Sequence, residues 1–153
     1  MDTLDRKAQI LAVEDDPHIR ILLHHLLRGH YDVKIVGCVD EALHAVSGQR
    51  FDLFLIDINL REHYNGIDLL HALHRLPVYR NTPAIACTAY AMHGDQSRLL
   101  DEGFLGYVGK PFARESLIGT VEAALDETSQ IDAEVHALPS VSALTESLHS
   151  VAA

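Results

Sequence analysis

The sequence predicts a single α/β domain built on a parallel sheet of five strands. Short apolar segments alternate five times with longer segments in which apolar residues recur every three or four positions. Strands that alternate with helices are typical of parallel sheets with right-handed crossovers. The short segments are almost continuously apolar, as expected of strands that helices cover on both faces. At 153 residues and 48% hydrophobic content, the chain can bury a sizeable core.

The first two strand–helix pairs are bounded by clear signals. Residues 9–13 are predicted as a strand, and Pro17 then opens a helix that Gly29 ends. Residues 33–36 are predicted as the second strand. Asp40 is the expected N-cap of the helix that follows it.

Three further strand–helix pairs complete the domain. They are predicted, in chain order, at residues 51–56, 67–76, 84–87, 91–102, 106–109 and 111–125. This pattern fits best the flavodoxin-like doubly wound fold, with five strands in the order 2-1-3-4-5 and five helices. A glycine-rich dinucleotide motif is missing after the first strand, and no P-loop motif occurs, so a nucleotide site of either type is not expected.

Residues 127–153 differ in composition from the predicted domain at residues 1–126. They hold four acidic residues and no lysine, arginine or glycine. Apolar residues recur at helical spacing in two pieces that Pro139 separates. Either this tail forms one or two amphipathic helices, which dock on the domain or pair between protomers, or it frays, because short helices are marginal without tertiary contacts.

The overall charge narrows the classes of partner. Acidic residues number 22 and basic residues 12, for a net charge of −10, which argues against binding to nucleic acid or to anionic lipid. No segment approaches the roughly 20 apolar residues that span a membrane, and the N-terminus lacks the apolar core of a signal peptide. A cytoplasmic protein with two reduced, buried cysteines is expected.

Eleven histidines raise the question of a metal site on a helix. His24 and His25 are adjacent, and His71 and His74 are three residues apart on a predicted helix. Neither pair has a third and fourth ligand at a recognisable zinc spacing. The sequence therefore favours solvated histidines on helix faces.

Four polar residues follow directly after predicted strands: Asp15, Asp57, Thr88 and Lys110. Because the carboxyl ends of parallel strands meet at one edge of a sheet, these side chains are expected to lie together where ligands bind in such folds. Two carboxylates, a hydroxyl and an ammonium group suit a divalent cation and a phosphoryl group.

The carboxylates of this set suggest a specific chemistry. Asp57 is either a solvated loop residue or a nucleophile that accepts a phosphoryl group. Glu14, Asp15 and Asp16 are adjacent and repel one another unless a cation intervenes, and Mg²⁺ prefers such oxygen ligands. Alone, these three residues could simply favour a helix N-terminus. The backbone carbonyl of Asn59 could complete the metal shell.

Four motifs in the right order resemble the receiver domain of two-component response regulators. They are Ile-Leu-Ala-Val-Glu-Asp-Asp-Pro at residues 10–17, Leu-Ile-Asp-Ile-Asn at 55–59, Cys-Thr-Ala at 87–89 and Gly-Tyr-Val-Gly-Lys-Pro-Phe at 106–112. The segment at residues 88–95 also resembles receivers attached to hybrid histidine kinases and their single-domain relatives.

The resemblance implies a phosphoacceptor and its metal. Asp57 would take a phosphoryl group from a phosphohistidine on a sensor histidine kinase or a histidine phosphotransfer protein. Asp15, Asp57 and the carbonyl of Asn59 would hold Mg²⁺ (or Mn²⁺), with Glu14 assisting. The chain would then be no enzyme, apart from catalysing its own phosphorylation and dephosphorylation.

The resemblance also implies a switch. Thr88 and Lys110 would bind the phosphoryl oxygens, and the aromatic ring of Tyr107 would turn inward when Thr88 moves. Protein contacts would change on the face of the fourth helix, fifth strand and fifth helix. Ala89 and Tyr90 border the site, and we expect Tyr90 to shield the acyl phosphate from water.

Two departures from the family, the bulky Tyr90 beside the site and the loop at residues 60–66, and two alternative functions remain. The loop at residues 60–66 lacks the proline common after the metal loop, which leaves its geometry open. A phosphohydrolase with an Asp-x-Asp pair would need an acid where Asn59 stands. The other alternative is a receiver-shaped scaffold that is never phosphorylated. A homodimer through the fourth and fifth helices or the tail is possible.

Overall fold

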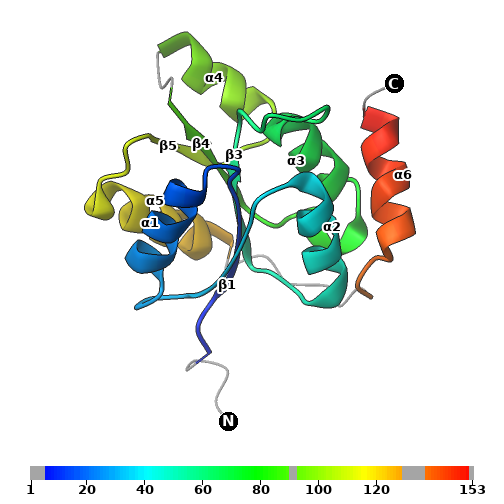
Figure 1. The fold of residues 1–153 in the computed structure, drawn as a ribbon, viewed down its shortest axis with the longest axis horizontal. Coiled ribbons are helices and arrows are strands. Elements are labelled where there is room, and N and C mark those ends of the chain that lie inside the picture. The colour runs from blue at the N-terminus through cyan, green and yellow to red at the C-terminus, as the bar shows by residue number, and fades with distance from the viewer. Residues whose placement is uncertain (1–5, 90–92, 129–136, 152–153) are drawn as a thin grey trace.

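A computed structural model describes residues 6–89, 93–128 and 137–151. The chain forms a parallel sheet between two layers of helices (Figure 1). The strand order β2-β1-β3-β4-β5 confirms the predicted flavodoxin-like topology. The strands are β1 (Gln9–Val13), β2 (Asp32–Val36), β3 (Leu53–Asp57), β4 (Ala84–Thr88) and β5 (Gly106–Gly109).

Helices cover both faces of the sheet. They are α1 (Pro17–Leu27), α2 (Val39–Gly48), α3 (Gly66–His74), α4 (His93–Asp101), α5 (Arg114–Thr128) and α6 (Val141–Val151), with a short 3₁₀ helix, η2, at Pro77–Tyr79. Helices α1 and α5 lie on one face, and α2 and α3 lie on the other with α6 outside them (Figure 1).

The strand side chains alternate between two cores. Along β1, Ile10 and Ala12 pack with residues of α1 and α5, whereas Leu11 and Val13 pack with residues of α2, α3 and α6. All four are essentially inaccessible to solvent. Covering both faces explains why the strand sequences are apolar throughout.

The helix starts confirm one sequence prediction and correct another. Pro17 opens α1, as predicted, and Asp16 before it caps the helix by accepting a hydrogen bond from the amide of His18 at 2.8 Å. Asp40 is not an N-cap: α2 begins at Val39 after Cys38, which makes no side-chain cap. Asp40 instead lies in the first turn, where a negative charge favours the helix dipole.

Helix α6 docks on the domain. Leu144 and Leu148 are buried in the same core as α2 and α3, and the Ser147 hydroxyl donates to the carbonyl of Ala72 at 2.8 Å. Docking is thus the alternative that holds for residues 141–151, whereas residues 129–136 lie outside the described part of the chain. The domain boundary at residue 126 stays a prediction.

The paired histidines of α3 are half-buried rather than fully solvated, and each has a protein partner that the sequence did not indicate. His71 Nε2 lies 2.9 Å from a carboxylate oxygen of Glu102, and His74 Nε2 donates to the carbonyl of Thr82 at 2.9 Å. Glu102 lies 31 residues after His71 and Thr82 lies 8 residues after His74, both outside α3, so the helical pattern of α3 could not indicate them.

Cys87 is buried and Cys38 half-buried, both as free thiols. Across the described residues, no helix combines the length and the apolar character needed to cross a bilayer.

Candidate functional site

The carboxyl ends of four strands lie level at one edge of the sheet. Val13 pairs with Ile56, Asp57 with Cys87, and Thr88 with Gly109. Asp57 is the last residue of β3 and is only 3% exposed. This alignment brings together the strand-end residues that the sequence predicted as neighbours.

A close backbone approach fixes the chain beyond Asp57. The amide of Asn59 donates to Asp57 Oδ1 at 3.1 Å, and α3 begins at Gly66 directly against this turn. A Cβ atom on Gly66 would lie 2.2 Å from the carbonyl oxygen of Asp57. Only glycine fits at this position without a shift of the backbone. Asn65 and Asp68 close the helix start with a reciprocal capping box.

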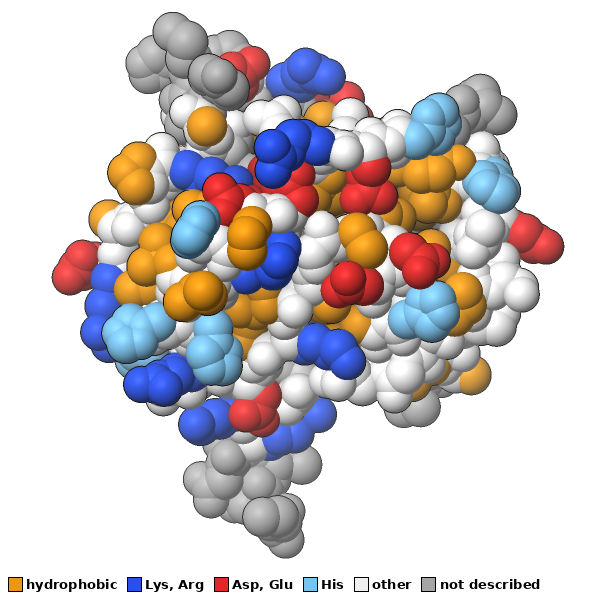
Figure 2. All heavy atoms as spheres, viewed as in Figure 1, with side chains coloured by type: hydrophobic (Ala, Val, Ile, Leu, Met, Phe, Trp, Pro, Cys, Tyr) orange, Lys and Arg blue, Asp and Glu red, His pale blue; other side chains and the backbone are white. Residues whose placement is uncertain are grey.

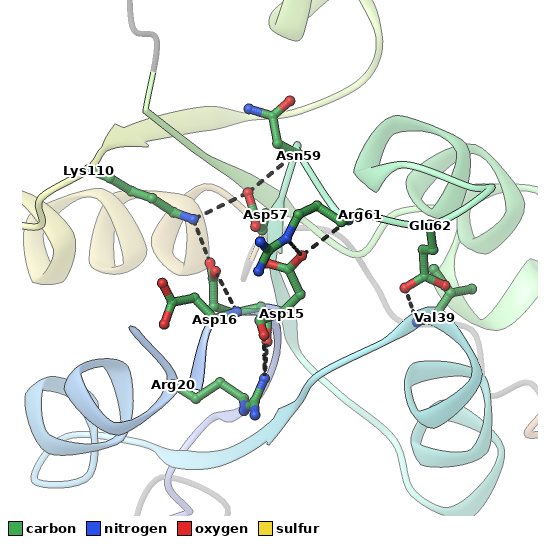
Figure 3. Close-up of polar contacts among 10 residues, drawn as sticks. Asp15, Asp16, Arg20, Val39, Asp57, Asn59, Arg61, Glu62 and Lys110 are labelled. Atoms are coloured by element: carbon green, nitrogen blue, oxygen red, sulfur yellow. Dashed lines mark hydrogen bonds and ion pairs between the residues drawn. The ribbon is translucent and has the colours of Figure 1, made fainter. Parts of the chain in front are cut away.

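The turn after β1 presents two further carboxylates. Glu14 is buried, and its amide donates to the carbonyl of Val36 at 3.0 Å. The guanidinium of Arg20 donates to the backbone carbonyls of Glu14 and Asp15 at 2.9 and 3.0 Å, which holds the turn in place (Figure 3). Asp16 caps α1, so its carboxylate is engaged outside the site.

Lys110 reaches across the sheet edge from the end of β5. Its Nζ lies 2.7 Å from Glu14 Oε2 and 3.3 Å from Asp57 Oδ1 (Figure 3). The Lys110–Pro111 peptide is cis, and the amide of Lys110 donates to the carbonyl of Thr88 at 2.9 Å. The ammonium group is therefore enclosed between two buried carboxylates, with its side chain 18% exposed.

Burial and nearby charges shift the pKa values of the site residues in opposite directions. Burial raises the pKa of Glu14 despite its hydrogen bond to Lys110, and the nearby charge of Asp57 adds to the rise. Burial alone would lower the pKa of Lys110, but the bond to Glu14 and the charges of Asp57 and Glu14 raise it. Burial would raise the pKa of Asp15, yet its contacts with Arg61 outweigh burial and lower it. Lys110 therefore stays charged near neutral pH.

Three carboxylates are close enough to share a metal ion. Glu14, Asp15 and Asp57 each offer an oxygen, and these atoms lie within 4.8 Å of one another. An all-oxygen set of this kind fits Mg²⁺, which takes one or two carboxylates and keeps several waters. The donor chemistry of the site thus agrees with the cation expected from the sequence.

The remaining predicted residues lie around this centre. Thr88 is buried at the end of β4, and Tyr107 is half-buried on β5 against the core that holds α3. Ala89 is exposed beside Thr88. Tyr90 lies outside the described residues, so its shielding of the site stays a prediction.

Arg61 is the residue that sequence reasoning missed. Its backbone amide and its Nε both donate to Asp15 Oδ2, at 3.1 and 3.0 Å (Figure 3). It also lines a groove of about 370 Å³ with Asn59, Thr88 and Arg98. Figure 2 shows acidic and basic side chains gathered over the ends of β1 and β3. The only sequence signal was a basic residue in a loop that departs from the family pattern.

Known proteins resemble this chain both in fold and in sequence. A family model for the response regulator receiver domain matches residues 10–122. The chain belongs to this family. Receiver domains are signalling modules, and the match ends before α6.

Individual relatives include both kinases and regulators. The signal transduction histidine-protein kinase BarA of Shigella flexneri is 35% identical over 109 residues, which are 71% of this chain and 12% of the kinase. The DNA-binding response regulator MtrA of Mycolicibacterium smegmatis is 35% identical over 136 residues, or 88% of this chain and 57% of the regulator. This chain therefore spans a small part of the first and little more than half of the second.

Solved structures agree with the fold. The receiver domain of the sensor histidine kinase PA1611 of Pseudomonas aeruginosa PAO1, with a magnesium ion coordinated in its active site cleft, has a TM-score of 0.70 at 30% identity. The match covers 78% of this chain and 98% of that domain. The chemotaxis protein CheY4 of Vibrio cholerae has a TM-score of 0.71 at 28% identity, covering 77% of this chain and 98% of that protein.

Proposed function

We propose that this receiver accepts a phosphoryl group on Asp57 and passes the signal on through protein contacts. One observation carries the proposal: the buried Asp57 carboxylate lies 3.3 Å from a lysine ammonium, among acidic oxygens that suit a divalent cation. A carboxylate that attacks a phosphoryl group needs such positive charge close by. The donor would be the phosphohistidine of a sensor histidine kinase or of a histidine phosphotransfer protein.

In the transfer step, an oxygen of Asp57 bonds to phosphorus as the bond from phosphorus to the imidazole nitrogen breaks. The electron pair of that bond returns to the imidazole. Lys110 neutralises charge on the phosphoryl oxygens, and the Thr88 hydroxyl donates a hydrogen bond to one of them. Lys110 must exchange part of its contact with Glu14 for this role.

The residues that would hold Mg²⁺ or Mn²⁺ are Asp15, Asp57 and the carbonyl of Asn59, with Glu14 assisting. The bound cation would offset the repulsion between Asp57 and the incoming phosphoryl oxygens. The same constellation would allow the chain to speed its own phosphorylation and the later hydrolysis of the acyl phosphate.

Signal output would follow from the position of Thr88. A Thr88 side chain drawn toward the phosphoryl group leaves space that the ring of Tyr107 can occupy, which repacks the face formed by α4, β5 and α5. Ala89 and Tyr90 would modulate access of water to the site. A partner protein, or a second copy of this chain, would read the altered face.

The test is intact-mass analysis of the full chain after exposure to Mg²⁺ and acetyl phosphate. We expect the wild type and the control Asp40→Asn, which changes an exposed residue of α2, to gain the mass of one phosphoryl group. Asp57→Asn should gain none. An unmodified wild type would contradict the proposal and favour a scaffold. Continuous consumption of the donor without a modified protein would favour a phosphohydrolase.

A further inference from the structure

Two positively charged side chains contact the carboxylates of the site, and they differ in exposure to solvent. Lys110 is enclosed and is shared between Glu14 and Asp57. The Arg61 side chain is 80% exposed and pairs with Asp15, which is itself 19% exposed (Figure 3). The proposed phosphoryl chemistry uses Lys110 and leaves Arg61 without a role.

The guanidinium of Arg61 neutralises a carboxylate that a divalent cation would need as a ligand. It hydrogen-bonds Asp15, one of the three carboxylates that can share a metal, and this bond and the charge of Asp15 raise the pKa of Arg61. The charges of Asp16 and Asp57 add to the rise, so Arg61 lies in the field of the same acidic cluster. It always carries its charge.

An exposed arginine can leave this position easily. Its guanidinium regains water when it swings out, whereas Lys110 would leave two buried carboxylates without a partner. The backbone amide of Arg61 also bonds Asp15, so the loop stays anchored when the side chain moves.

We propose that Arg61 is a built-in competitor of Mg²⁺, which neutralises Asp15 in the cation-free site and must be displaced when the cation binds. This inference rests on the proposed function only for its purpose: competition from Arg61 sets the Mg²⁺ concentration at which Asp57 can accept a phosphoryl group. Its consequence is a receiver that binds the cation more weakly than the same site without the guanidinium.

The direct test is the Mg²⁺ affinity of the full chain, measured by calorimetry, with Mn²⁺ binding followed by electron paramagnetic resonance as a second readout. We expect Arg61→Ala to bind Mg²⁺ about two- to fivefold more tightly than the wild type, the range that an exposed ion pair allows. Arg61→Lys should fall between the two, because an ammonium lacks the fork that grips Asp15.

The matched control is Arg98→Ala, which removes the same charge from the same groove. It should change the affinity by less than about 1.5-fold, because salt screens exposed charges that do not touch the ligands. Equal effects of Arg61→Ala and Arg98→Ala, weaker binding by Arg61→Ala, or no Mg²⁺ binding by the wild type would each overturn the proposal. Tighter Mg²⁺ binding in Arg61→Ala without phosphoryl incorporation in any variant would support the competition and refute the proposed function instead.

Discussion

The phosphoacceptor site and the packing of α6 on the domain contribute to stability in different ways. We call the contact of Leu144, Ser147 and Leu148 with α2 and α3 the α6 seam. The site buries Glu14 and Asp57 around the ammonium group of Lys110, and the cost of removing these charges from water cancels much of what their attraction contributes to stability. The seam buries two leucines and satisfies its hydroxyl, so it contributes stability.

The two regions also differ in how they relate to the receiver family. The site lies within the matched residues 10–122, and α6 lies beyond them. The comparison shows that the site, within the family match, buries charged groups, while α6, beyond that match, adds ordinary apolar packing. We therefore expect substitutions in the site to affect function first and substitutions in the seam to affect stability first.

The largest effect should come from the position where the site permits no side chain. Gly66→Ala places a methyl group against the carbonyl of Asp57 and the side chain of Ile56, at 2.2 and 2.9 Å. Because backbone must move to relieve this contact, we expect a loss of about 3 kcal/mol or more in the free energy of unfolding, measured in urea. Phosphoryl incorporation should fall as well.

Gly119→Ala is the matched control for this prediction. Gly119 is exposed within α5, and a Cβ atom there would contact nothing within 4 Å. Alanine is the better helix former, so this variant should gain up to about 1 kcal/mol. A Gly66→Ala variant as stable as the wild type would show that the turn after Asp57 tolerates a shift, against the rigid site described above.

Leu148→Ala tests the seam alone. Leu148 is 3% exposed, and truncation of a buried leucine costs 2 to 5 kcal/mol. Because α6 packs on the outside of α2 and α3, we expect a loss near the lower end of this range, about 2 kcal/mol, and faster amide hydrogen exchange in α6. The control Leu138→Ala, at a position 39% exposed, should change stability by no more than about 0.5 kcal/mol. A large loss of phosphoryl incorporation in Leu148→Ala would refute the separation of the two regions.

The sequence predicts some features of the site and the fold, and it does not predict others. The fold and the set of Asp15, Asp57, Thr88 and Lys110 follow from alternating segments and their ends, because parallel strands carry their last residues to one edge. The partner of Arg61 does not follow, since an exposed loop side chain has many possible partners.

The amphipathic pattern of residues 141–151 predicts a buried face but not the surface that buries it. The partners of His71 and His74 were missed for a related reason, because Glu102 and Thr82 reach them only through the tertiary fold. Local patterns indicate elements and strand ends, whereas contacts between distant segments require the packed structure.

A smaller effect is expected from His74, the last residue of α3. Burial lowers the pKa of His74 below 6.5, the charge of His71 lowers it further, and the hydrogen bond to Thr82 opposes the shift. Below pH 6.5 the unfolded chain therefore binds a proton that the folded chain does not, so stability falls as the pH falls. The slope from this group is at most about 1.4 kcal/mol per pH unit.

His74→Gln keeps an N–H donor but does not titrate. Its unfolding free energy should depend less on pH between pH 6.5 and 5 than that of the wild type, whereas the exposed control His25→Gln should retain the wild-type profile. Identical profiles for all three proteins would assign the acid sensitivity in this range to other groups, and the loss from Asp15, whose pKa is lowered by its contacts with Arg61, would follow at still lower pH.

The smallest expected effect measures whether the two regions communicate. Tyr64, in the loop that carries Arg61, lies 6.3 Å from the ring of His149 on α6 at a tilt of 38°. This separation is near the outer limit for a favourable aromatic pair, so we expect a coupling of about 0.5 kcal/mol in a double-mutant cycle of Tyr64→Ala and His149→Ala. The same four proteins should be titrated with Mg²⁺. If the seam only adds stability, His149→Ala leaves the Mg²⁺ affinity unchanged. If His149→Ala shifts the Mg²⁺ affinity of the wild type but not that of the Tyr64→Ala variant, α6 positions the loop through this contact. Helix α6 would then tune a site that it does not touch.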